Sequence, residues 1–121
     1  MKGYSIKQSV KAAMRGVIYA FKNERNFRVE IYIAIFVITA LLVLKASLVQ
    51  TAIIIMMIFL VLMIELMNTV IERIVDILKP RKHPYAGVIK DLSASMVLVL
   101  SIGASIVGLI IFVPLFLVAV K

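Results

Sequence analysis

A chain of 121 residues in which 64% are hydrophobic has more apolar surface than a soluble domain of this size can bury, which excludes an ordinary soluble protein. The lack of cysteine and the single histidine exclude disulfides, zinc–cysteine sites and a multi-histidine metal site within one chain. The net charge of +8 permits a nucleic-acid partner, but the long apolar stretches explain the chain better, so we expect no nucleic acid. The composition indicates an all-α integral membrane protein with a single domain, residues 1–121.

The first expected element is an amphipathic helix over about 5–22. Its apolar side chains recur at three- and four-residue intervals from Val10 to Phe21. The basic side chains that alternate with them are Lys7, Lys11, Arg15 and Lys22. This pattern is typical of a helix that lies on the cytoplasmic surface of a membrane.

Three membrane spans follow, over about 27–48, 49–78 and 92–120. A tight turn from Lys45 to Gln50 joins the first span to the second. At about 1.5 Å per residue the second helix is about 45 Å long, so its last turns must emerge from the hydrocarbon. The third span is uncharged and carries small residues that favour close packing between membrane helices.

The positions of the basic residues predict the orientation of the chain. Seven of the fourteen precede the apolar run of the first span, Ile31–Leu44, and five more lie around the segment 79–90. Cytoplasmic loops of membrane proteins are enriched in lysine and arginine. We therefore expect the N-terminus in the cytoplasm and the C-terminus on the opposite side.

Four polar residues, Glu65, Asn68, Glu72 and Asp76, follow the apolar part of the second span at intervals of three, four and four. At about 100° per residue they share one helical stripe of roughly 80°. Carboxylates at membrane depth are unfavourable by several kcal/mol unless they are paired, hydrated or bound to a cation. The stripe therefore predicts a site for a divalent ion or a proton acceptor.

Other acidic residues are expected at the same membrane face, among them Glu24 and Asp91. Magnesium prefers one or two carboxylates together with phosphate oxygens and water, and nearby basic residues complement a polyphosphate. The five glycines form no phosphate-binding loop, so side chains would have to hold a nucleotide. The pattern favours a magnesium–nucleotide site at the inner boundary of the membrane.

Structural explanations exist for the same residues. Glu65 could form a hydrogen bond between helices. Glu72 and Asp76 could belong to a solvated helix end paired with basic neighbours such as Arg73. The pair Lys90-Asp91 could cap the third span.

The segment 65–76, Glu-Leu-Met-Asn-Thr-Val-Ile-Glu-Arg-Ile-Val-Asp, resembles the ELxNxxxExxxD signature of the prokaryotic diacylglycerol kinase and undecaprenol kinase family. His83-Pro84 and Lys90-Asp91 follow at the family's spacing, and Asn23–Arg28 resembles its NExxFR element. The resemblance covers nearly the whole chain. It implies a small membrane homotrimer with composite active sites between subunits, in which the γ-phosphate of Mg-ATP is transferred to a lipid hydroxyl.

The resemblance also implies individual roles. Glu65 would be the catalytic base for the lipid hydroxyl, and Glu24 and Glu72 would hold Mg²⁺. The residues that would position the nucleotide are Asn68, Asp76, Lys90 and Asp91. Arg28 and Glu30 would lie near the substrate or support the site. Arg81 and Lys82 depart from the usual family pattern, so they receive no role, and none is assigned to His83.

These observations predict an ATP-dependent lipid kinase, with several spans, in the bacterial inner membrane. Undecaprenol is the favoured acceptor, because the Glu-Arg-Asn-Phe-Arg and Glu-Arg-Ile-Val-Asp stretches resemble that branch more closely. A diacylglycerol kinase that makes phosphatidic acid is the alternative. A small proton- or cation-coupled transporter and a structural membrane protein are more distant alternatives.

Overall fold

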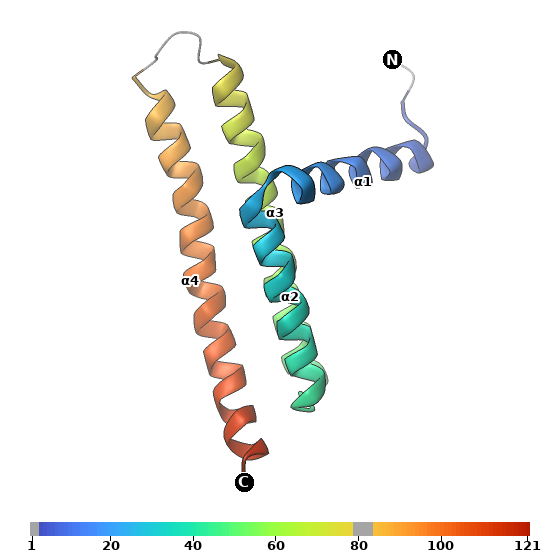
Figure 1. Ribbon diagram of the computed structural model, residues 1–121, viewed down its shortest axis with the longest axis vertical. Helices are drawn as coiled ribbons and strands as arrows, with labels where there is room; N and C mark the ends of the chain where they lie inside the picture. Colours follow the sequence, from blue (N-terminus) through green and yellow to red (C-terminus); the bar gives the residue numbers. More distant parts are fainter. Residues whose placement is uncertain (1–2, 79–83) are drawn as a thin grey trace.

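The computed structural model describes residues 3–78 and 84–121, which form four α-helices (Figure 1). Their bounds are α1, Ile6–Asn23; α2, Arg25–Val43; α3, Leu48–Leu78; and α4, Ala86–Ala119. The last three are long and apolar enough to cross a membrane, which confirms the expected all-α fold with three spans. The predicted motif residue His83, together with Arg81 and Lys82, lies outside the described residues.

The helix α1 lies across the long axis of the three spans (Figure 1). It begins with a capping box, in which Ser5 and Gln8 exchange side-chain and backbone hydrogen bonds. Apolar side chains such as Ile6, Val10 and Met14 stay more than half exposed. A helix with an uncovered apolar face and basic residues is consistent with the predicted position on the membrane surface.

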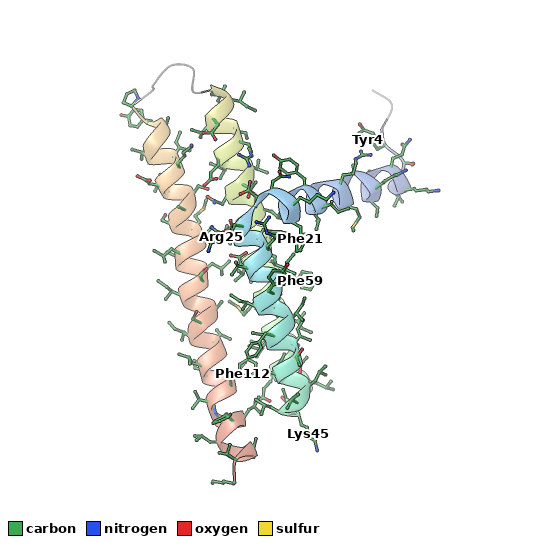
Figure 2. The ribbon with its side chains drawn as sticks, viewed as in Figure 1. Tyr4, Phe21, Arg25, Lys45, Phe59 and Phe112 are labelled. Atoms are coloured by element: carbon green, nitrogen blue, oxygen red, sulfur yellow. The ribbon has the colours of Figure 1, made fainter. Side chains whose placement is uncertain are left out.

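A sharp corner joins α1 to α2, and Glu24 is the one residue between them. Arg28 Nη1 donates to the carbonyls of Phe21 and Lys22 at 2.9 Å each. These bonds satisfy carbonyls that the end of α1 would otherwise leave without partners. Figure 2 places Phe21 and Arg25 at this corner and Lys45 at the far end of α2. The corner therefore fixes where Glu24 lies relative to the spans.

Two helix ends differ from the predicted spans. The helix α2 ends at Val43 rather than near 48, because Lys45 adopts a left-handed backbone conformation with φ of 54° that breaks the helix. The helix α4 begins at Ala86, six residues before the predicted start of its span. Loss of charge marks where a chain enters hydrocarbon, whereas a helix can continue beyond the membrane. Lys90 and Asp91 consequently lie on a helix and not in a loop.

The central helix of the bundle is α3, which packs against both α2 and α4. At one end, Leu41, Ile54 and Ile111 of the three spans form an apolar core. Toward the other end, the buried residues of α3 become polar, and α3 and α4 extend past the level of α1 (Figure 1). Packing thus buries the first two residues of the polar stripe of α3, Glu65 and Asn68, against the neighbouring helices.

Candidate active site

The predicted stripe of α3 descends from a buried end to an exposed end. Glu65 has 2% of its surface exposed and Asn68 has 8%, while Glu72 is half-buried and Asp76 is exposed. The exposure increases in the order of the residues because the C-terminal end of α3 extends past the level of α1 (Figure 1). One helix therefore presents its polar groups at successive depths.

The carboxyl group of Glu65 has an oxygen, Oε2, that is buried and has no hydrogen-bond partner among the described residues. Its backbone carbonyl accepts a bond from Thr69 Oγ1 at 3.1 Å. A buried polar atom without a partner is unfavourable, and in native proteins such atoms are uncommon. The free oxygen Oε2 takes part in no structural hydrogen bond within the described chain. A buried carboxyl oxygen of this kind suits a group that accepts a proton from a ligand.

Other carboxylates converge on Glu65 from α2 and from the corner. The charges of Glu72 and Glu24 act on Glu65, and the charge of Glu65 acts on Glu30. Glu30 Oε2 is also buried without a partner in the described part of the chain. Like charges repel, so carboxylates on neighbouring parts of the bundle suit a cation that offsets part of the repulsion.

The donor set fits a hard divalent cation that is completed by a ligand. Within residues 3–78 and 84–121, no three acidic or histidine side chains are close enough to hold a metal by themselves. Magnesium usually takes one or two carboxylates and fills its other positions with water and phosphate oxygens. Glu24 and Glu72 can supply the carboxylates, with the rest left to a nucleotide.

Two ion pairs connect the predicted site residues across helices. Arg73 of α3 pairs with Glu24, and Lys90 of α4 pairs with Asp76 of α3. The first joins α3 to the corner between α1 and α2. The second replaces a local Lys90–Asp91 pair, and Asp91 lies exposed on α4. Asp76 and Lys90 are therefore brought together at the exposed end of the stripe.

A hydrogen-bonded chain of three side chains links α4 to the stripe. Ser93 Oγ donates to Asn68 Oδ1 at 2.7 Å, and Asn68 Nδ2 donates to Glu72 Oε1 at 3.4 Å. Ser93 is not among the residues predicted for the site. The one signal that could have found it is its position one helical turn after Lys90, on the face of α4 that meets α3.

An apolar groove of about 410 Å³ runs between α2, α3 and α4. Glu30 lines it, and its other lining side chains are mostly aliphatic, with Phe112 of α4 farther along (Figure 2). Glu30 is the one acidic residue of this lining, so the groove joins the apolar part of the bundle to a carboxylate. It is a suitable place for a hydrocarbon chain whose polar end reaches Glu65.

The fold and the site define a small multi-span membrane protein with a carboxylate cluster at one end of its helices. The model of the family described as prokaryotic diacylglycerol kinase matches residues 11–112, and the chain belongs to this family of lipid kinases. The matched region contains every residue predicted for the site. Membership in this family confirms the resemblance seen in the sequence and favours the kinase hypothesis over the transporter hypothesis.

Three relatives illustrate the range of the family. The chain is 36% identical over 107 residues to a diacylglycerol kinase of Synechocystis sp., covering 88% of this chain and 61% of that relative. It is 34% identical over 102 residues to an undecaprenol kinase of Bacillus subtilis, covering 84% and 83%. It is 33% identical over 105 residues to a diacylglycerol kinase of Haemophilus influenzae, covering 86% and 89%. The relatives are thus named for two different lipid acceptors.

Proposed function

We propose that this protein transfers the γ-phosphate of Mg-ATP to the hydroxyl group of a membrane lipid alcohol, and that undecaprenol is the preferred acceptor. The observation that carries the proposal is the carboxyl group of Glu65. It is buried, one of its oxygens lacks a partner in the described structure, and it shares the stripe of α3 with Glu72. This is the arrangement that a proton acceptor next to a cation site requires.

In the proposed mechanism, Glu65 accepts the proton of the lipid hydroxyl as that oxygen attacks the γ-phosphorus in line with the leaving group. The buried position of Glu65 keeps bulk water away from the reacting atoms. Glu24 and Glu72 would hold the cation, which would neutralise charge on the phosphates when it is bound. The positions of Asp76, Lys90 and Asp91 suit contacts with the nucleotide on the cytoplasmic side, and Asn68 would support the site from its buried position.

The apolar groove and the relatives bear on the acceptor. The groove begins near Glu30 and follows the bundle, so a single long isoprenoid chain could lie along it with its hydroxyl near Glu65. The name of the Bacillus subtilis relative and the resemblance of two sequence stretches support undecaprenol. Diacylglycerol is the second candidate, because two of the relatives are named for it.

The proposed enzyme is a homotrimer in the bacterial inner membrane with its N-terminus in the cytoplasm. Large apolar side chains are exposed on all three spans, among them Phe36, Phe59 and Leu98, and these must contact lipid or neighbouring subunits. The basic residues around the N-terminus and the segment 79–90 support the orientation. A composite site would also bring in groups from a second subunit, since one chain offers few cation ligands.

A direct assay tests the activity and the acceptor together. Purified protein in mixed micelles is incubated with Mg²⁺ and γ-labelled ATP and with equal mole fractions of undecaprenol or diacylglycerol. We expect label in undecaprenyl phosphate at a kcat/KM at least about tenfold higher than for diacylglycerol, a difference of about 1.4 kcal/mol. Preference for diacylglycerol would correct the acceptor, and no transfer to either lipid would overturn the proposed kinase activity.

A further inference from the structure

Ser93 is the most buried polar residue described in the chain, with 1% of its surface exposed, and its hydroxyl makes a contact between helices. It donates from α4 to Asn68 Oδ1 on α3 at 2.7 Å. Ser95 and Ser105 behave differently, because their hydroxyls donate to backbone carbonyls of α4 itself. That local bond is the usual one for a serine within a helix, so the contact of Ser93 with α3 is specific to its position.

This hydroxyl satisfies the side-chain amide of Asn68 in the orientation that Glu72 requires. An ionised carboxylate can only accept hydrogen bonds, so the amide nitrogen must be the group that faces Glu72. The amide oxygen then faces α4, where it needs a donor, and Ser93 supplies that donor. If the donor were lost, the buried amide oxygen of Asn68 would have no partner, and the side chain would be held less firmly with its nitrogen toward Glu72.

We propose that Ser93 is a positioning residue which, through Asn68, holds the Glu72 carboxylate in the orientation that receives a divalent cation. This inference rests on the proposed function, in which Glu72 is a ligand of the cation that accompanies ATP. Ser93 touches neither the cation nor the reacting atoms. Removal of a group that orients a metal ligand through a hydrogen bond typically lowers the metal affinity by about 10–100-fold.

The test is the binding of Mn²⁺ in the presence of a non-hydrolysable ATP analogue, measured by electron paramagnetic resonance on the full-length protein. Ser93→Ala removes the donor and keeps a good helix-forming residue. We expect it to weaken Mn²⁺ binding by about tenfold. The matched control is Ser95→Ala, which removes a hydroxyl two residues away that bonds only to its own helix, and it should leave the affinity unchanged. In turnover assays, Ser93→Ala should raise the Mg²⁺ requirement while kcat recovers at saturating Mg²⁺.

Two further variants separate positioning from packing. Ser93→Cys keeps nearly the same volume but has only a weak donor, so it should lose affinity as Ser93→Ala does. In an Asn68→Ala background, Ser93→Ala should cause no further loss, because the group it acts through is already gone.

Three results would overturn the inference. The first is an unchanged Mn²⁺ affinity in Ser93→Ala when the wild-type protein binds the probe. The second is full affinity in Ser93→Cys, which would show that the loss in Ser93→Ala came from packing. The third is an equal loss from Ser93→Ala with or without Asn68. Wild-type protein that binds no Mn²⁺–nucleotide would instead overturn the proposed function itself, and the inference with it.

Discussion

Arg73 of α3 is ion-paired with Glu24, the residue at the corner between α1 and α2, although the two are 49 positions apart in the chain. The side chain of Glu24 is 18% exposed and that of Arg73 is 47% exposed. The pair holds the corner against the central helix. In the proposed function Glu24 also binds a cation, so Arg73 and the cation would compete for the same carboxylate.

Arg73→Gln should therefore tighten the binding of Mn²⁺ measured without nucleotide. A partly exposed ion pair contributes about 0–1 kcal/mol, so the gain should not exceed about fivefold. Arg25→Gln is the control, because it removes one positive charge at the same corner from an exposed side chain. Weaker Mn²⁺ binding in Arg73→Gln alone would show that Arg73 supports the site and does not compete with the cation.

Glu65→Gln should lower kcat by about 10²–10⁴-fold, because it removes the proposed proton acceptor and keeps the size of the side chain. Binding of Mn²⁺–nucleotide and the helix content by circular dichroism should stay at the wild-type level. Glu30→Gln is the matched comparison, since its Oε2 is also buried without a partner in the described structure. A larger loss of kcat in Glu30→Gln than in Glu65→Gln would move the role of the base to Glu30.

Glu24→Gln and Glu72→Gln should each raise the concentration of Mg²⁺ needed for half-maximal activity by at least about tenfold, because each removes a charged ligand. Titration of activity with Mg²⁺ after chelation with EDTA measures this requirement. The wild-type protein should lose activity on chelation and regain it when Mg²⁺ is restored. An unchanged requirement in both variants would remove these two carboxylates from the cation site.

Lys90→Ala should raise the KM for ATP by about tenfold, since it removes the positive charge at the cytoplasmic end of the site. Its effect on stability should be small, because Lys90 and Asp76 are 30% and 45% exposed and such ion pairs contribute at most about 1 kcal/mol. Thermal unfolding and steady-state kinetics separate the two effects. Lys7→Ala, far along the surface helix, is the control for loss of one positive charge. An unaltered KM would limit Lys90 to a structural role.

Labelling of single cysteines tests the proposed orientation, because the natural chain contains no cysteine. A membrane-impermeant maleimide should label Lys121→Cys in right-side-out vesicles and Lys7→Cys in inverted vesicles. Labelling of both variants from the same side would contradict an odd number of crossings between these positions. The opposite pattern, with Lys7→Cys labelled in right-side-out vesicles, would place the N-terminus outside the cytoplasm.

The spans and the stripe could be predicted because both are local properties of the sequence. Continuous apolar stretches define helices that need to be hidden from water, and the spacing of Glu65, Asn68, Glu72 and Asp76 places them on one face of any helix. Their order along α3 also determines which of them lies deepest. These features do not depend on how the neighbouring helices are rotated.

The contacts between helices could not be predicted in the same way. The bonds of Ser93 with Asn68 and of Arg73 with Glu24 depend on how α4 and the corner are rotated toward α3. A serine among small apolar residues looks like a packing residue until its partner is known. The start of α4 at Ala86 could not be predicted from hydropathy either, because hydropathy marks the edge of the membrane and not the end of a helix.

The corner between the surface helix and the first span contains no flexible linker. Glu24 is its one residue, and its backbone is tied on both sides, with its N–H bonded to the Ala20 carbonyl and its carbonyl bonded to Arg28 N–H. A tilt of α1 on the bilayer is therefore transmitted directly to the residue whose carboxylate faces α3. In the proposed function, the position of α1 on the membrane and the geometry of the cation site would be coupled through this one residue.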